Sequence, residues 1–111
     1  MIKYAHIAIP TKEGFRLTNP SDIIYCQADG HHTQLFLTGN QMIDVNKKLK
    51  EVGGLLEEEV FVRIHHSTII NLSHLKEYLN SPTNLVRMSN GVELAVSLRK
   101  KKQLMSLFRK F

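Results

Sequence analysis

The chain has 111 residues, of which 42% are hydrophobic and 23% charged, as expected for one soluble globular domain. No apolar stretch approaches the ~18 residues that a helix needs to cross a bilayer, so no membrane partner is expected. The single cysteine, Cys26, lies in the apolar run "DIIYCQA" and has no second cysteine to pair with. It predicts a small buried residue and a reducing, cytoplasmic location.

The net charge of +5 is distributed unevenly along the chain. The segment from Leu94 to the C-terminus contains no acidic residue and carries Arg99, Lys100, Lys101, Lys102, Arg109 and Lys110. A one-ended excess of basic side chains attracts polyanions, of which nucleic acid is the first candidate. On charge alone, a basic helix end that merely faces solvent explains the same excess.

The first part of the chain predicts β-strands separated by turns. Residues 6–11 alternate between apolar and polar, and two more short runs follow in residues 13–30, on either side of the turn signal Asn19–Asp22. Residues 31–45 contain a strand, the pair Gly39–Asn40 and another strand. A two-residue turn of that chemistry is typical of a hairpin.

The period then changes, because apolar residues in residues 45–59 recur every three or four positions, at Val45, Leu49, Val52 and Leu56. This spacing predicts a helix with one buried face. Lys47, Lys48 and Lys50 are expected on its solvent side. Gly53–Gly54 is expected to end or bend the helix.

Strand patterns return after Phe61, in residues 61–65, 75–80, 84–89 and 92–96. The stretch "STIINLSHL" between the first two fits either a strand or a short helical turn. The Asn90–Gly91 pair predicts a tight turn with positive φ at both residues.

The C-terminal segment predicts a second helix with Ser97 as its N-cap. Its expected packed stripe is Leu98, Leu104, Met105 and Phe108. Residues 99–102 are all basic and fall in the first turn, where cations oppose the helix dipole at a cost of a few tenths of a kcal/mol each. Such a segment usually has another use for its charges, such as an anion docked at the same helix end. The expected fold class is therefore mainly β with one or two short helices.

Metal binding and enzyme catalysis are both disfavoured by the residue spacing. The adjacent pairs His31–His32 and His65–His66 project to opposite faces if they lie on strands, so neither pair chelates one ion easily. Ser67 beside His66 has the composition of a nucleophile and base, but no nucleophile elbow or phosphate loop accompanies it. We expect no metal, no cofactor and no catalytic residue.

Nucleic-acid binding accommodates more of these features. The segments "DGHHTQ", "HHST" and "SLRKKK" are three donor-rich points far apart in sequence, as a long groove contact made by several loops requires. RNA binding is less favoured, because the aromatic residues sit mostly in apolar runs and offer no stacking platform. A protein-interaction or allosteric module without DNA affinity is the chief alternative.

Three segments resemble the successive signatures of LytTR-type DNA-binding domains: "DIIYCQADGHHTQLFL", "FVRIHHSTIINLSHLKEY" and "GVELAVSLRKKKQL". The resemblance runs from about Ile7 to Phe108. It implies an elongated, mainly β fold of stacked sheets, forming a single domain over residues 1–111 whose loops contact successive major grooves of double-stranded DNA. Such domains usually follow a receiver domain in bacterial two-component response regulators that answer to a sensor kinase, and bind paired direct repeats as dimers. No receiver domain is present in these 111 residues, so we expect either a domain cut from a longer chain or a stand-alone regulator.

The resemblance also implies roles for particular residues. Base reading falls to Thr33, with His32 beside it, and to His66 and Arg99. Phosphate contacts fall to Ser67, Ser97, Lys100 and Lys102. Arg63 and His65 match positions that organise the fold, so the turn "HHST" is expected to aim His66 outward while His65 points inward and fastens the turn.

Overall fold

The stretch Ile23–Cys26 is apolar without alternation because it lies in the central strand of the protein and is covered on both faces. The computed structural model describes residues 6–110. Its strands are β1 (Ile7–Pro10), β2 (Phe15–Thr18), β3 (Ile23–Asp29), β4 (His32–Leu37), β5 (Gln41–Val45), β6 (Phe61–His65), β7 (Thr68–Asn71), β8 (Leu75–Leu79), β9 (Leu85–Met88) and β10 (Glu93–Ala95). The α-helices are α1 (Leu49–Gly54) and α2 (Leu98–Met105), and short 3-10 turns span Pro20–Asp22 and Leu72–His74.

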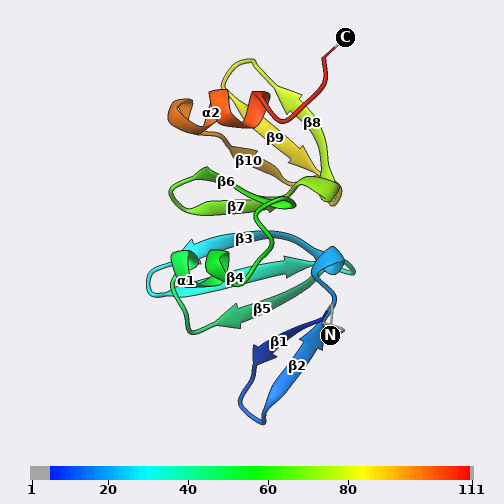
Figure 1. Cartoon of the computed structure of the whole chain (residues 1–111), viewed down its shortest axis with the longest axis vertical. Helices are drawn as coiled ribbons and strands as arrows, with labels where there is room; N and C mark the ends of the chain where they lie inside the picture. The colour runs from blue at the N-terminus through cyan, green and yellow to red at the C-terminus, as the bar shows by residue number, and fades with distance from the viewer. Residues whose placement is uncertain (1–5, 111) are drawn as a thin grey trace.

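The strands form three antiparallel sheets that stack along the long axis of the molecule (Figure 1). The middle sheet has five strands in the order β5-β4-β3-β7-β6, so β3 lies at its centre and β6 at one edge. A hairpin of β1 and β2 lies beyond one side, and a three-stranded sheet in the order β10-β9-β8 lies beyond the other. The extents of 45 × 35 × 25 Å confirm the predicted elongated, mainly β fold with two short helices.

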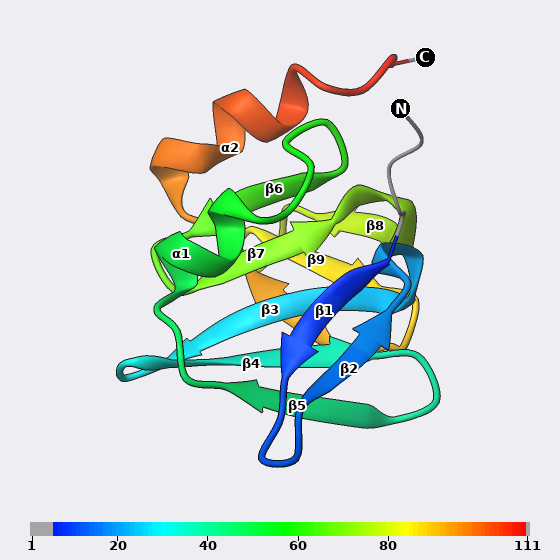
Figure 2. The ribbon, with the colours of Figure 1, turned by 60° about the horizontal axis from the view of Figure 1, so that its bottom comes forward.

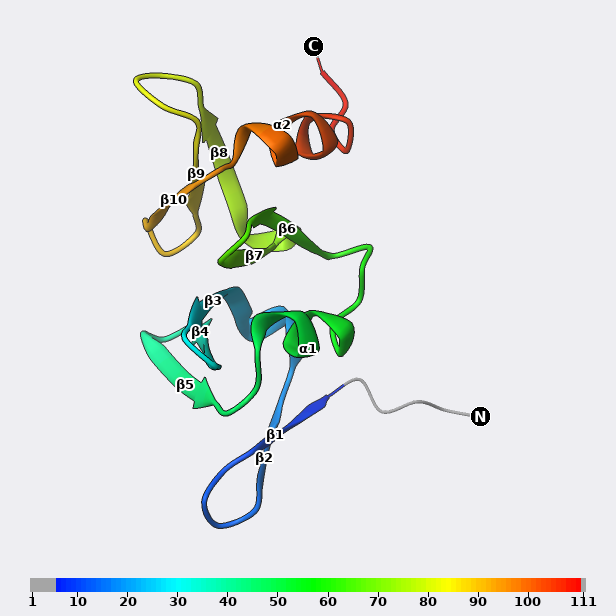
Figure 3. The same cartoon turned by 90° about the vertical axis from the view of Figure 1, so that its left-hand side faces the viewer.

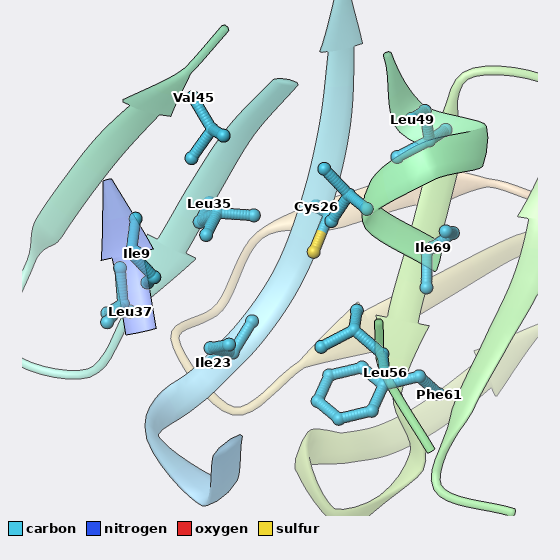
Figure 4. Packing of buried hydrophobic residues seen from close by; sticks show 11 residues of the cluster. Ile9, Ile23, Cys26, Leu35, Leu37, Val45, Leu49, Leu56, Phe61 and Ile69 are labelled. Carbon is cyan, nitrogen blue, oxygen red and sulfur yellow. The ribbon is translucent and has the colours of Figure 1, made fainter. Parts of the chain in front are cut away.

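One hydrophobic core lies between the first face of the middle sheet, α1 and the β1–β2 hairpin (Figure 4). Its buried members are Ile9, Ile23, Cys26, Leu35, Leu37, Val45, Leu49, Val52, Leu56, Phe61 and Ile69. Cys26 is 0% exposed and lies among these side chains as a small apolar residue, as the sequence predicted.

A second core lies between the opposite face of the middle sheet, the three-stranded sheet and α2 (Figure 3). Its buried members are Ile24, Tyr25, Ile64, Ile70, Val86, Met88, Leu94, Val96 and Leu104. The register of β3 against β4 shifts between Ile23 and Tyr25, which is a bulge. The bulge turns two consecutive residues, Ile24 and Tyr25, toward the same core, so β3 supplies both faces.

The region around α1 matches the sequence prediction except at its start. Helix α1 ends at Gly54, as the glycine pair predicted. Val45, however, is the last residue of β5 rather than part of the helix, although it packs in the same core as Leu49. Gly53 packs so closely that a Cβ built there lies 3.0 Å from the Ile69 Cδ1 atom, which leaves little room for any larger residue.

The predicted stripe of α2 is wrong at both ends. Leu104 is fully buried and Met105 packs against the second core, but Leu98 is 78% exposed and Phe108 is 39% exposed. Leu98 and Leu104 are six positions apart, which at 3.6 residues per turn places them about 120° apart around the helix. Phe108 lies beyond the end of the helix at Met105.

The turn predictions are confirmed in place but not in every detail. The β4–β5 hairpin has a three-residue loop rather than two, since Leu37 pairs with Gln41, and Gly39 and Asn40 have φ of 76° and 58°. At the β9–β10 turn only Gly91 has positive φ, at 85°, while the Asn90 side chain accepts a hydrogen bond from the Val92 amide.

The stretch "STIINLSHL" contains both structures that its sequence allowed, a strand and then a 3-10 turn. Asn71 stands between them with a fully buried side chain. Its amide nitrogen donates to the Ile23 carbonyl at 2.9 Å, and its amide oxygen accepts from the Ser73 amide at 2.9 Å. These bonds fix the end of β7 to the start of β3.

Burial raises the pKa of the Cys26 thiol to about 12, above the ~8.5 of an exposed thiol. The un-ionised thiol therefore contributes fully to stability below about pH 8.5, and this contribution is lost as the pH rises toward the folded-state pKa. We expect the free energy of unfolding to fall by about 2 kcal/mol more for the parent than for Cys26→Ala between about pH 8 and pH 10. Urea unfolding of both proteins measures this difference. The pKa values of Tyr25 and Tyr78 are also raised by burial, but both proteins share them, so parallel pH profiles would contradict the assignment.

Candidate nucleic-acid interface

Three connections far apart in sequence lie along one edge of the molecule, at the left in Figures 1 and 2. They are the β3–β4 turn, the β6–β7 turn and the junction between β10 and α2. The first two are neighbours because Gln27 of β3 pairs with Gln34 of β4 and with Thr68 of β7. The Ala28 amide also donates to the Ser67 carbonyl at 2.9 Å, which ties the two turns together directly.

The β10–α2 junction is attached to the edge strand β6. The Ser97 amide donates to the Ile64 carbonyl at 2.9 Å. Ser97 is also the N-cap of α2, as predicted, because its hydroxyl accepts from the Lys100 amide at 3.2 Å. The first turn of α2 therefore begins beside the β6–β7 turn.

The β6–β7 turn is held by side chains that bond to its backbone. Arg63 donates from Nε to the His65 carbonyl at 3.1 Å, and from its guanidinium NH2 group to the His66 carbonyl. His65 Nδ1 lies 2.9 Å from the Ser67 hydroxyl and accepts from the Ser67 amide at 3.3 Å. The accepting Nδ1 places the ring proton of a neutral His65 on Nε2. This geometry fits the expected fastening role of Arg63 and His65, although His65 is only half-buried.

His66 is exposed, and its side chain borders an open hollow of about 410 Å³ at the end of the turn. The hollow is lined by Arg63, His66, Ser97, Arg99 and Lys100. The fold thus brings together four residues that the resemblance singled out for DNA contact, from two separate segments. All of the titratable residues in the lining are basic or neutral, so the hollow suits a negatively charged or hydrogen-bonding ligand.

The assignment of Thr33 as a base reader does not fit the structure. Its side chain is 0% exposed, and its hydroxyl donates to the Lys47 carbonyl at 2.7 Å. Thr33 lies on the same face of β4 as Leu35 and Leu37, and that face packs in the first core. In this turn Asp29, Gly30 and His31 are exposed, and His32 is half-exposed.

The other predicted contacts differ in how free their side chains are. The His32 Nδ1 atom lies 3.2 Å from an Asp44 carboxylate oxygen, in an orientation that makes no hydrogen bond. The Ser67 hydroxyl is already shared between His65 and Thr68. Lys102 is exposed but stands outside the hollow lining.

Sequence reasoning missed two exposed side chains at this edge. Leu98 was assigned to the core, yet it projects into solvent immediately before Arg99. His31 was included only in a possible metal pair and in the donor-rich segment "DGHHTQ", without a role of its own. A helical-wheel comparison of Leu98 with Leu104 holds the signal that identifies Leu98, and the position of His31 in the turn before β4 is the signal for its exposure.

Other site types find no support along this edge. Among residues 6–110, no group of three or more His, Cys, Asp or Glu side chains is placed to hold a metal ion. The rings of His65 and His66 are close, with centroids 4.3 Å apart and planes tilted by 36°. Within the same residues, no helix has the length and apolar character needed to cross a membrane.

Known proteins share both this sequence pattern and this architecture. The family model of the LytTr DNA-binding domain matches residues 13–109, so the chain belongs to this family of DNA-binding domains. The sensory transduction protein LytT of Bacillus cereus is 32% identical over 112 residues, and LytT of Bacillus anthracis is 31% identical over 112 residues. Each alignment covers 93% of this chain but only 42% of the relative, so the chain spans less than half of those proteins.

A solved structure has the same fold. It is the LytTr DNA-binding domain of a response regulator from Bacillus cereus, with a TM-score of 0.80 over 95% of this chain and 97% of that one. Its sequence identity of 24% makes this a likeness of fold. The family is defined by DNA binding rather than by catalysis, in line with the function class inferred from the residues.

The turn geometry predicts that the two histidines differ in how much their side chains contribute to stability. His65→Ala removes the acceptor of the Ser67 amide and should lower the free energy of unfolding by about 1 kcal/mol. His66→Ala truncates an exposed side chain and should change stability by less than about 0.5 kcal/mol. Thermal melting of both variants against the parent measures the two effects, and a larger loss for His66→Ala would reverse the assignment.

Proposed function

We propose that this domain binds double-stranded DNA sequence-specifically and regulates transcription, with the edge that carries the hollow inserted into the major groove. The observation that carries the proposal is the joint exposure of His66 and Arg99 around one basic hollow. The major groove is about 12 Å wide and admits a projecting turn or helix end of this kind.

The two side chains suit base reading in different ways. The guanidinium group of Arg99 is a planar fork that matches the O6 and N7 atoms of guanine. Arg99 is the second residue of α2, at the end of the helix that borders the hollow. A neutral His66 accepts or donates one hydrogen bond at a base edge, and a protonated His66 donates at both ring nitrogens. Leu98, exposed beside Arg99, offers an apolar contact of the kind that thymine methyl groups accept.

Phosphate contacts are proposed for the remaining residues of the junction. Lys102 lies in the last turn of α2, whereas Lys100 and Lys101 follow Arg99 in the first turn, which contains no acidic residue. Their mutual repulsion and their opposition to the helix dipole are relieved by a phosphate oxygen at the same position. Ser97 lines the hollow and keeps its hydroxyl proton available, because its oxygen serves as acceptor in the helix cap.

The context of the domain is proposed from its relatives. The curated relatives are sensory transduction proteins more than twice as long as the matched region. We infer that the domain acts as the output part of a cytoplasmic two-component regulator whose receiver domain is controlled by a sensor kinase. Binding as a dimer to paired direct repeats would let two copies of the exposed edge read two sites.

The proposal predicts that Arg99→Ala weakens binding to a preferred duplex by roughly 1–3 kcal/mol, the range of a lost bidentate base contact. Binding to a scrambled duplex should weaken far less, because base contacts contribute little there. Fluorescence anisotropy titrations on both duplexes, after selection of a preferred site from a random pool, measure the discrimination.

Arg109→Ala is the matched control, because it removes the same charge from an exposed position beyond α2. It should leave the ratio of the two affinities unchanged. If Arg99→Ala discriminates between the two duplexes as strongly as the parent does, Arg99 is not a base-reading residue. Failure of the parent to bind any duplex would favour a protein-interaction module.

A further inference from the structure

A second depression borders the basic hollow, between α1, the edge strand β6 and α2. Its volume is about 490 Å³, and its polar lining includes Lys50, Glu58, Arg63, Lys100 and Gln103. Figure 3 shows the two helices on either side of β6, and the segment that links α1 to β6 closes one end. We call this depression the α1–α2 groove.

The groove and the hollow adjoin each other on the surface. Arg63 and Lys100 line both of them, so the two depressions share one wall. Strand β6 runs along the groove toward His65, next to the exposed His66, so the groove leads directly to the proposed reading site.

The charges of the groove lack internal partners. Among residues 6–110, no carboxylate lies within ion-pair distance of the ammonium group of Lys50 or Lys100. The Arg63 guanidinium donates to two backbone carbonyls, which leaves its positive charge uncompensated. Three unneutralised cations around one depression repel one another, and a polyanion relieves that repulsion.

The floor of the groove is open because of the residues that end α1. Gly53 and Gly54 both line the groove, and neither carries a side chain that would fill it. A Cβ built on Gly54 meets no atom within 4 Å, so the space above it is empty. The backbone of α1 is therefore accessible between Lys50 and β6.

We propose that the α1–α2 groove binds a phosphodiester of the DNA strand beside the bases read by His66 and Arg99, with Lys50 and Lys100 as its two ammonium donors. This inference rests on the proposed function, because it needs DNA in the hollow. A backbone strand borders the major groove on each side, so a reader inserted in the groove has phosphates next to it. Lysine suits this position, since its ammonium group binds phosphate as a point charge from a flexible stem.

Glu58 sets the limit of this phosphate track. It lines the same groove and is exposed, within the acidic run of residues 57–59. A carboxylate in the groove repels a second phosphate, so one phosphodiester bound by Lys50 and Lys100 is the expected occupancy. Removal of the Glu58 charge should therefore strengthen duplex binding.

The test is a salt titration of duplex binding by Lys50→Gln, Glu58→Gln and Lys76→Gln beside the parent. Lys76 is the matched control, an exposed lysine on β8, which lies toward the opposite edge in Figure 1. For Lys50→Gln we expect the slope of log K against log[salt] to become shallower by about 0.9 and affinity at 0.15 M salt to fall about fivefold on preferred and scrambled duplexes alike. Lys76→Gln should keep the parent slope, and Glu58→Gln should bind more tightly at low salt.

The outcomes separate this inference from the function on which it rests. A parent that binds duplex with a steep slope, together with an unchanged slope in Lys50→Gln, overturns the groove assignment and leaves the proposed function standing. Equal changes in Lys50→Gln and Lys76→Gln overturn it as well, because they report net charge alone. Capture of a poly-glutamate peptide that requires Lys50, without an effect on duplex binding, assigns the groove to a protein partner instead. A parent that binds no duplex overturns both.

Discussion

Burial of β3 on both faces is the constraint on which the rest of the structure depends. A strand with side chains in two cores must lie between two other strands, and each face must be covered by further elements. The β1–β2 hairpin and α1 cover one face, while α2 and the three-stranded sheet cover the other. The β3–β4 turn and the β6–β7 turn belong to strands that pair with β3 or to β3 itself, so their positions follow from the same burial.

Arg87 on the three-stranded sheet and Lys100 at the edge with the hollow differ in how their charges are compensated. In the three-stranded sheet, Arg87 bonds to Glu77 and Glu93 on the neighbouring strands, and these carboxylates raise its pKa. Such a cross-strand network satisfies its own charge and needs no ligand. At the edge with the hollow, by comparison, Lys100 has no carboxylate partner among residues 6–110. The charge of Lys100 is therefore available for the phosphate contact proposed above.

The sequence predicted the fold class, most strands, both helices and the cap at Ser97, because these depend on local periodicity and turn chemistry. It also singled out His66 and Arg99, and the bond from Ser97 to the Ile64 carbonyl brings their two segments together. Thr33 was misassigned because a family resemblance identifies a position in the sequence but does not say whether its side chain is buried. The alternation of Thr33, Leu35 and Leu37 along β4 marks Thr33 as inward-facing. The α1–α2 groove was unpredictable, since it joins Lys50 to Lys100 across half the chain.

Arg63 holds the turn through two backbone groups, the carbonyls of His65 and His66. Every residue type has such a carbonyl, so the turn keeps its shape whichever side chain occupies position 66. Substitution at position 66 therefore changes the side chain that the turn presents to solvent, while the two bonds that shape the turn are kept. Under the proposed function, a single substitution there alters base preference and leaves folding intact.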